Sequence, residues 1–232
     1  MAPPTAQPFT ETVIARLRTA YGAAADPDRA VPMAAYMRQR FRFLGIPMPQ
    51  RRALSRDVLA GLPVPTETDL LSVADACWAL EHREYQYFGT DLLARHAAGL
   101  TPRSMPTLEG LIATKSWWDT IDALASRVVG PVVARYPTLV PTLDAWIRAG
   151  NIWLVRTGLL HQLRYRKTTD SDRLFRYCSA RCGDPDFFVR KAIGWALREY
   201  ARSDPEAVRR FVAENQGRMA PLSVREALRT WT

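Results

Sequence analysis

Two segments, "LVRTGLLHQLRY" at Leu154–Tyr165 and "FVRKAIGWALRE" at Phe188–Glu199, align at a constant spacing of 34 residues. The matched pairs are Val155 with Val189, Arg156 with Arg190, Leu159 with Ile193, Leu163 with Leu197 and Arg164 with Arg198. One further step back from Arg156 reaches Asp122, within "SWWDTID". A helical pair repeated at this spacing cannot bury its apolar face alone, so it must stack on its neighbours. The spacing therefore predicts an all-α superhelical solenoid of helical-hairpin repeats with a concave surface.

The rest of the sequence agrees with this fold class. Apolar residues recur at helical spacing, whereas sustained strand alternation and Asn-Gly hairpins are missing. We predict one solenoid domain over residues 1–232, in which the Pro-rich residues 1–8 form a frayed tail. The predicted helices are 9–24, 30–41, 50–61, 67–80, 83–97, 105–115, 117–129, 138–149, 152–166, 170–182, 186–202, 204–215 and 222–231.

Composition narrows the choice of partner. A hydrophobic fraction of 47% indicates a packed core, and the net charge of +9 suits a polyanion, either nucleic acid or an anionic membrane surface. Most of that charge is arginine, which forms forked contacts to phosphate, although a GC-rich genome also enriches arginine. No stretch is long enough to span a membrane and no signal peptide is recognisable, so we expect a soluble, cytoplasmic protein.

Cysteine and histidine offer no pattern that points to a metal. The three cysteines are an odd number, which argues for a reducing compartment rather than a disulfide framework. Cys178 and Cys182 lie one helical turn apart, and no histidine stands at a matching spacing, so both are interpreted as packing residues. We therefore predict neither a metal site nor a cofactor.

The helix predicted over 186–202 has an unusual outer side. Its core stripe is Val189, Ile193 and Leu197, and the other side presents Lys191, Gly194, Trp195 and Arg198, with Arg190 at the margin. A tryptophan among cations is not ordinary packing, and Gly194 leaves room for something to approach the helix. Trp195 either belongs to a binding surface or packs against the adjacent repeat, and the spacing leaves both open.

The segment "SWWDTID" has the same kind of division. Trp117 joins a core stripe, whereas Trp118 and Asp122 lie four residues apart on one flank and Asp119 faces solvent. Asp122 occupies the position that arginine takes in the next two repeats. One interpretation is a salt bridge between repeats, from Asp122 to Arg156. The other is an aromatic wall and a carboxylate placed together to handle a positive charge.

Four long stretches now identify a family. They are "YMRQRFRFLGIPMPQRR", "SWWDTID", "WLVRTGLLHQLRYRKTTD" and "DFFVRKAIGWALREYA", and the C-terminal "LSVREALR" also fits. In their order and spacing the chain resembles the AlkD family of bacterial DNA alkylation-repair glycosylases, which are built from HEAT-like repeats. One departure is Pro47, where relatives carry a polar residue after "LGI", because proline offers no side-chain donor.

The resemblance implies hydrolytic removal of N3- and N7-alkylated purines, such as 3-methyladenine and 7-methylguanine, from double-stranded DNA. The sequence leaves the oligomeric state open, and we expect a monomer that needs no obligate protein partner. The resemblance places Trp118, Asp122 and Trp195 in the catalytic site, with Arg156 on a backbone phosphate. It also places Arg164 at a backbone contact and Tyr36 near the DNA. Arg190, Lys191 and Arg198, from the basic side of helix 186–202, complete the predicted DNA-binding set.

The chemistry that these residues support is simple. An alkylated purine is already cationic and leaves without protonation, while positive charge develops on the sugar. A fixed anion near that charge stabilises the transition state more than the ground state, a role that we assign to Asp122. Two alternatives remain: a non-catalytic HEAT-repeat protein that binds damaged or structured DNA, and a protein-interaction scaffold, against which the net charge weighs.

Overall fold

The computed structural model describes residues 9–229, whose secondary-structure elements are all helices with no strand, so the all-α prediction is confirmed. The chain divides into two compact units, Met1–Gly99 and Leu100–Thr232, and each is described by itself. The predicted tail at residues 1–8 and the last residues of the helix predicted over 222–231 lie outside the described part. No helix within residues 9–229 combines the length and the apolar character that crossing a membrane requires.

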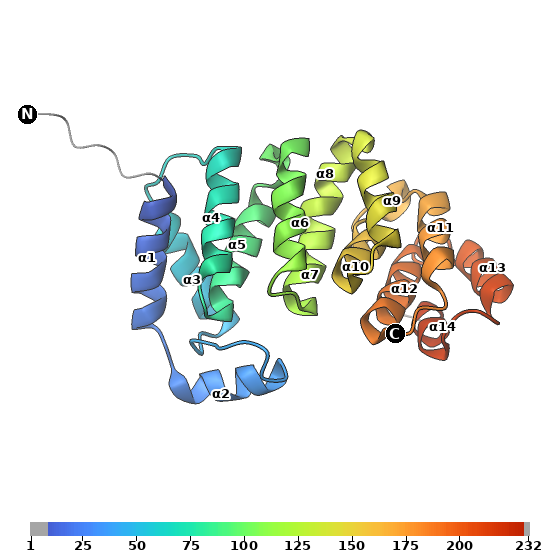
Figure 1. Cartoon of the computed structure of the whole chain (residues 1–232), viewed down its shortest axis with the longest axis horizontal. Coiled ribbons are helices and arrows are strands. Elements are labelled where there is room, and N and C mark those ends of the chain that lie inside the picture. The colour runs from blue at the N-terminus through green and yellow to red at the C-terminus, as the bar shows by residue number, and fades with distance from the viewer. Residues whose placement is uncertain (1–8, 230–232) are drawn as a thin grey trace, which may run out of the picture. The chain divides into compact units, whose positions relative to one another are not determined.

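The first unit packs α4 against α5, and α1 against both α3 and α4. Its helices are α1 (Phe9–Ala23), α2 (Pro27–Tyr36), α3 (Met48–Leu59), α4 (Glu67–Ala79) and α5 (Arg83–Arg95), followed by a short 3₁₀ turn, η1 (Ala97–Gly99) (Figure 1). The fully buried Glu84 accepts hydrogen bonds from the backbone N–H groups of Leu44, Gly45 and Ile46. This carboxylate therefore holds the loop between α2 and α3 onto α5.

The second unit is organised around α10 (Ile152–Leu160), which packs against α6, α7, α9 and α12. The other α-helices are α6 (Met105–Ala113), α7 (Trp118–Leu124), α8 (Gly130–Arg135), α9 (Val140–Arg148), α11 (Ser171–Arg181), α12 (Phe187–Tyr200), α13 (Pro205–Asn215) and α14 (Pro221–Ala227). Short 3₁₀ turns are η2 (Pro102–Ser104), η4 (Pro137–Leu139) and η5 (Arg166–Thr168). In Figure 1, α10, α12 and α14 lie one beside the next.

Side-chain caps fix where the helices that carry functional residues begin. The Asn151 carboxamide accepts from the N–H of Trp153 at the start of α10. The Asp186 carboxylate accepts from the N–H groups of Phe188 and Val189 at the start of α12. Each cap satisfies donors that have no partner within the helix. The caps thus set the position of the first turn of α10 and α12, from which Trp153 and Phe188 project.

Gly194 allows α14 to approach α12 closely. A Cβ atom at Gly194 would lie 2.5 Å from the Glu226 Cβ and 3.0 Å from the Ser223 carbonyl oxygen. Gly194 thus leaves room for close approach to the helix, as expected, and the element that approaches is α14 of the same unit. The same contact brings the Glu226 side chain beside the outer side of α12.

The helix predicted over 117–129 is present from Trp118 onward and continues into α8, and its turn before Pro131 is widened. Trp117 is the extended N-cap of α7, and a π-helical segment, η3 (Ala125–Val129), joins α7 to α8. A proline lacks the N–H that would bond to the preceding turn, and a wider turn accommodates this loss. Within η3, the Ser126 hydroxyl donates to the carbonyl of Asp122 at 2.7 Å. The π-helical segment thus begins three residues after Asp122, the predicted catalytic residue, and is hydrogen-bonded to its backbone carbonyl.

Candidate active site

An open cavity of about 380 Å³, which we call the aromatic hollow, is formed by residues of α7, α10, α12 and α14. Its lining residues are Trp118, Arg156, Phe187, Phe188, Lys191, Trp195, Arg198 and Glu226. All of them belong to the second unit. Two tryptophans and two phenylalanines thus share one cavity with cations and a carboxylate.

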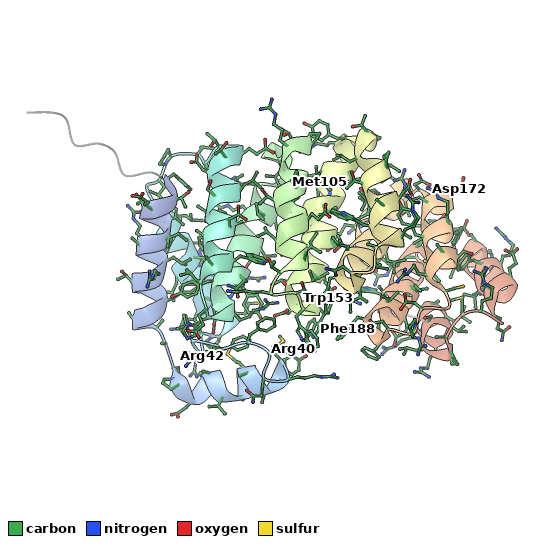
Figure 2. The ribbon with its side chains drawn as sticks, viewed as in Figure 1. Arg40, Arg42, Met105, Trp153, Asp172 and Phe188 are labelled. Atoms are coloured by element: carbon green, nitrogen blue, oxygen red, sulfur yellow. The ribbon has the colours of Figure 1, made fainter. Side chains whose placement is uncertain are left out.

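Phe188, which lines the hollow, belongs to a cluster of three aromatic rings. The ring of Trp117 lies 5.6 Å from that of Trp153 and 4.8 Å from that of Phe188, centroid to centroid, and Trp153 lies 5.0 Å from Phe188. Figure 2 shows Trp153 and Phe188 next to one another. Trp117 is buried, as predicted, and its neighbour Trp118 is half-buried and lines the hollow. Because Trp117 is the extended N-cap of α7, the two consecutive tryptophans point in different directions, Trp117 into the core and Trp118 into the hollow.

Asp122 and Arg156 form a two-pronged ion pair between α7 and α10. The Nε of Arg156 donates to Oδ1 at 2.7 Å and Nη2 donates to Oδ2 at 2.9 Å. The remaining terminal nitrogen, Nη1, donates to the Phe188 carbonyl at 2.6 Å. The side chains are only 6% exposed for Arg156 and 18% for Asp122, so the guanidinium has little surface left for another ligand. The salt-bridge interpretation of this residue pair is confirmed.

The protonation equilibrium of Asp122 is set by two opposing effects. Burial raises the pKa of Asp122 above its ordinary value, and the hydrogen bonds and charge of Arg156 oppose this rise without cancelling it. The nearby Asp119 also raises the pKa. A carboxylate held in this way is poorly solvated when ionised. Its negative charge therefore acts strongly on any positive charge that comes close.

A second carboxylate, that of Glu226 on α14, pairs with two cations of α12. Its Oε1 accepts from the Lys191 Nζ at 2.8 Å, and its Oε2 accepts from the Arg198 Nη1 at 2.5 Å. Hydrogen bonding from Lys191 and Arg198, together with their charges, holds the pKa of Glu226 below its ordinary value, against the opposing effect of burial. Lys191 and Arg198, which the sequence places on the outer side of α12, therefore share one anion of the same unit.

A second cavity, of about 500 Å³, shares Trp195 with the first, and we call it the polar hollow. It is lined by Ser126, Leu163, Arg164, Arg166, Trp195 and Glu199. Trp195 is half-buried and lines both cavities, so it separates an aromatic space from a polar one. Of the two interpretations left open for Trp195, exposure to a binding surface fits this placement.

The predicted site residues do not all meet. Trp118, Arg156, Lys191, Trp195 and Arg198 line the aromatic hollow, and Asp122 lies behind its Arg156. The others are placed elsewhere. Asp122 is bonded to Arg156 but is not itself a lining residue, and Arg164 lines the polar hollow. The Nε of Arg190 donates to the Asp184 carbonyl, and Tyr36 is an exposed residue of the first unit.

Sequence reasoning missed Glu226, Phe187, Phe188, Ser126 and Arg166. A signal for Glu226 was present, because Lys191 and Glu226 are 35 residues apart, close to the 34 that separate Asp122 from Arg156. Residues of opposite charge one repeat apart are thus neighbours in this unit. Nothing comparable in the sequence marks Phe188, whose backbone carbonyl is the functional group.

The aromatic hollow suits a ligand that carries positive charge. Aromatic faces favour positive charge, one carboxylate (Glu226) lines the hollow, and a second (Asp122) is bonded to its lining residue Arg156.

Among residues 9–229 no group of three His, Cys, Asp or Glu side chains is arranged to bind a metal ion. The cysteines Cys77, Cys178 and Cys182 are buried and unbridged, and burial raises the pKa of Cys77 to about 12.

Fold and site together define a helical-repeat protein with a charged aromatic cavity, and comparison with known proteins supplies the family. The family model described as "DNA alkylation repair enzyme" matches residues 17–230, so the chain belongs to this family and has a role in DNA repair. A solved structure described as a predicted DNA alkylation repair enzyme from Enterococcus faecalis is 32% identical, with a TM-score of 0.79. The similarity covers 88% of this chain and 94% of that one. Comparison with curated proteins finds no match.

Proposed function

We propose that the protein is a monofunctional DNA glycosylase that hydrolyses the N-glycosidic bond of N3- and N7-alkylated purines in duplex DNA. The observation that carries the proposal is the buried Asp122–Arg156 pair at the edge of an aromatic cavity. An anion held there by geometry, beside electron-rich ring faces, suits a reaction in which positive charge moves from base to sugar. Family membership supports DNA as the substrate.

The reaction needs no general acid. When the bond from C1′ to the base nitrogen breaks, its electron pair goes to the base and neutralises the positive charge that alkylation created. C1′ becomes electron-deficient, water adds to it, and a proton is released. The ionised Asp122 stabilises the cationic sugar and accepts a hydrogen bond from the incoming water. Its raised pKa reflects incomplete solvation, which strengthens the electrostatic effect.

The two half-buried tryptophans contribute through contact between their rings and the positively charged nucleotide. Trp118 on α7 and Trp195 on α12 both line the aromatic hollow, where they lie against the sugar or the cationic nucleotide. Such contacts contribute roughly 0.5 to 2 kcal/mol each. The hollow is open rather than enclosed, which fits recognition of the nucleotide from outside the helix without a deep base-binding pocket. Arg156 holds Asp122 in place and thereby orients its charge.

A single experiment tests the proposal. Duplex DNA treated with a methylating agent is incubated with the protein, and the soluble fraction is analysed for 3-methyladenine and 7-methylguanine. Release that exceeds the spontaneous rate supports glycosylase activity. Binding of methylated DNA without release would leave a non-catalytic DNA-binding protein, the alternative considered from the sequence.

A further inference from the structure

We propose that Ser126 is a positioning residue of the candidate active site, which acts through the main chain of Asp122. The inference rests on the proposed function for the reaction, but its evidence is the geometry of the turn that joins α7 to α8. Together with the π-helical segment η3, the hydroxyl of Ser126 fixes the direction in which the carboxylate of Asp122 projects.

The turn after Asp122 is wider than an ordinary helical turn. The Gly130 N–H donates to the carbonyl of Ala125, five residues earlier, whereas an α-helix joins residues four apart. A π-helical turn of this kind contains one residue more than an α-helical turn, and such turns occur frequently at functional sites. The helix that carries Asp122 therefore meets its neighbours in a register that a continuous α-helix would not give.

Packing against α10 imposes the wide turn at its C-terminal end. A Cβ atom at Gly130 would lie only 2.2 Å from the carbonyl oxygen of His161, so no larger residue fits there. The Tyr165 hydroxyl donates to the carbonyl of Gly130 at 2.6 Å. Pro131, the next residue, has no N–H with which to complete an α-helical turn. These contacts hold the start of α8 against the end of α10.

The same helix, α10, holds the other end of the turn. There the carboxylate of Asp122 accepts two hydrogen bonds from Arg156, of 2.7 and 2.9 Å. Asp122 and Gly130 are eight positions apart in the sequence, and both are fixed on one partner helix. The extra residue must therefore be accommodated between these two points, and Ser126 lies midway between them.

Ser126 restrains the side of the turn that adjoins Asp122. Its hydroxyl donates to the Asp122 carbonyl at 2.7 Å. The Ala125 N–H also donates to this carbonyl, but it is shared with the carbonyl of Ile121. Shared bonds of this type are common where a helix changes its form. The hydroxyl of Ser126 therefore supplies a second restraint on the backbone of Asp122.

This hydrogen bond is better explained by positioning than by stability. A serine hydroxyl that bonds to the carbonyl four residues earlier slightly destabilises a helix and often bends it. The Ser126 side chain is half-buried and lines the polar hollow, so it contributes little apolar packing. The direction of Asp122 matters more for the rate, because misplacement of a catalytic group by about 1 Å can lower a rate about 100-fold.

The test compares excision with DNA binding in variants of the full chain. Ser126→Ala removes the hydroxyl, and Ser126→Thr keeps a hydroxyl that can make the same bond. Release of 7-methylguanine is measured in single-turnover reactions, and affinity is measured for an undamaged duplex of the same sequence. The matched control is Thr114→Ala, which removes a hydroxyl bond of 2.7 Å to the carbonyl of Gly110, also four residues earlier. Thermal unfolding is recorded for every variant.

Ser126→Ala should lower the excision rate about fivefold to tenfold while affinity stays within about twofold, because only the direction of Asp122 changes. Ser126→Thr should restore the rate to within about twofold of the wild type, since threonine makes the same bond. Thr114→Ala should keep the wild-type rate. An unchanged rate for Ser126→Ala, an equal loss of rate and affinity, or a Ser126→Thr variant as slow as Ser126→Ala would each overturn the positioning role. An equal loss of rate in Thr114→Ala would overturn it as well.

A second measurement does not depend on excision. The carboxyl group of Asp122, which is influenced by Arg156 and Asp119, is titrated by NMR in the same variants. Ser126→Ala should raise the pKa of Asp122 further, since the hydrogen bonds of Arg156 that oppose its rise are loosened, and Ser126→Thr should restore it. If the wild type releases no methylpurine, the proposed function fails and the titration alone decides. A raised pKa in Ser126→Ala then supports the positioning of Asp122, and an unchanged pKa overturns it.

Discussion

The aromatic hollow and the polar hollow share Trp195 but treat charge in opposite ways. In the first, Arg156, Lys191 and Arg198 are all engaged by two carboxylates, Asp122 and Glu226. In the second, Arg164 and Arg166 have no acidic partner within the described residues. Two cavities with similar numbers of arginines thus differ in how many of their cations are already paired with a carboxylate. The comparison teaches that residue type alone does not identify a phosphate site, because pairing within the fold decides which cations remain available.

The largest effect is expected for the anion of the aromatic hollow. Asp122→Asn should reduce single-turnover release of 7-methylguanine at least about 100-fold, since one electrostatic group of a transition state is removed. Affinity for undamaged duplex should stay within about threefold, because an ionised carboxylate has no donor to offer a phosphate. The matched control is Asp119→Asn, one turn away, which should retain excision within about threefold.

Asp122→Asn also leaves the buried Arg156 without an anion, so its melting temperature is measured and excision is assayed well below it. Near wild-type release by this variant would remove the electrostatic role of Asp122.

At acid pH the excision rate of the wild-type protein should fall to that of the Asp122→Asn variant. Excision requires ionised Asp122, and burial raises its pKa, so the rate should fall about tenfold per pH unit once the pH drops below that raised value. The fall begins at a higher pH than the ordinary aspartate pKa of about 3.9 would give. Rates are measured over the range in which circular dichroism shows the protein folded. Parallel acid limbs for wild type and Asp122→Asn would assign the titration to another group.

Replacing the partner of Asp122 should have a smaller effect. Arg156→Met keeps the length of the side chain and removes the hydrogen bonds that oppose the raised pKa, so the acid limb should move to higher pH. Excision at neutral pH should fall about tenfold, because the carboxylate is no longer held in position. Arg190→Met, at the equivalent position of the next repeat, is the control.

The salt dependence of DNA binding by Arg156→Met distinguishes a role of Arg156 in positioning Asp122 from a role in binding phosphate. An unchanged slope is expected, since the guanidinium is engaged by Asp122 and the Phe188 carbonyl. A slope reduced by about one contact would instead return Arg156 to the phosphate-binding residues that the sequence predicted.

The smallest effect on the excision rate is expected for Glu226→Gln, and in this variant DNA affinity and excision should change in opposite directions. The change leaves Lys191 and Arg198 without their anion, so binding to undamaged duplex should strengthen about threefold while excision of the cationic base weakens about threefold to tenfold. A merely structural role would lower both. Glu206→Gln, which breaks an exposed ion pair with Arg209 on α13, should change neither.

Several features of the site were accessible from the sequence because they depend on one helix or on the repeat. Trp117 is a core residue and Trp118 a cavity residue, as predicted, although the extended N-cap conformation of Trp117 contributes to this division. The 34-residue spacing brought Asp122 and Arg156 together, although the sequence alone left a salt bridge and a charge-handling site as alternatives. For Gly194 the sequence indicated close approach but not what approaches, because the identity of the helix packed against it, α14, cannot be read from its own helix.

By itself, the sequence determined the all-α repeat fold and the register between α7, α10 and α12, since both follow from periodic burial of apolar residues. Only the tertiary structure decided which charges remain available. Charge pairing depends on separations of a few ångströms between side chains of different helices, as in the contacts of Glu226 with Lys191 and Arg198. It likewise decided that the turn after α10, held by Tyr165 and Gln162, faces a cavity of its own.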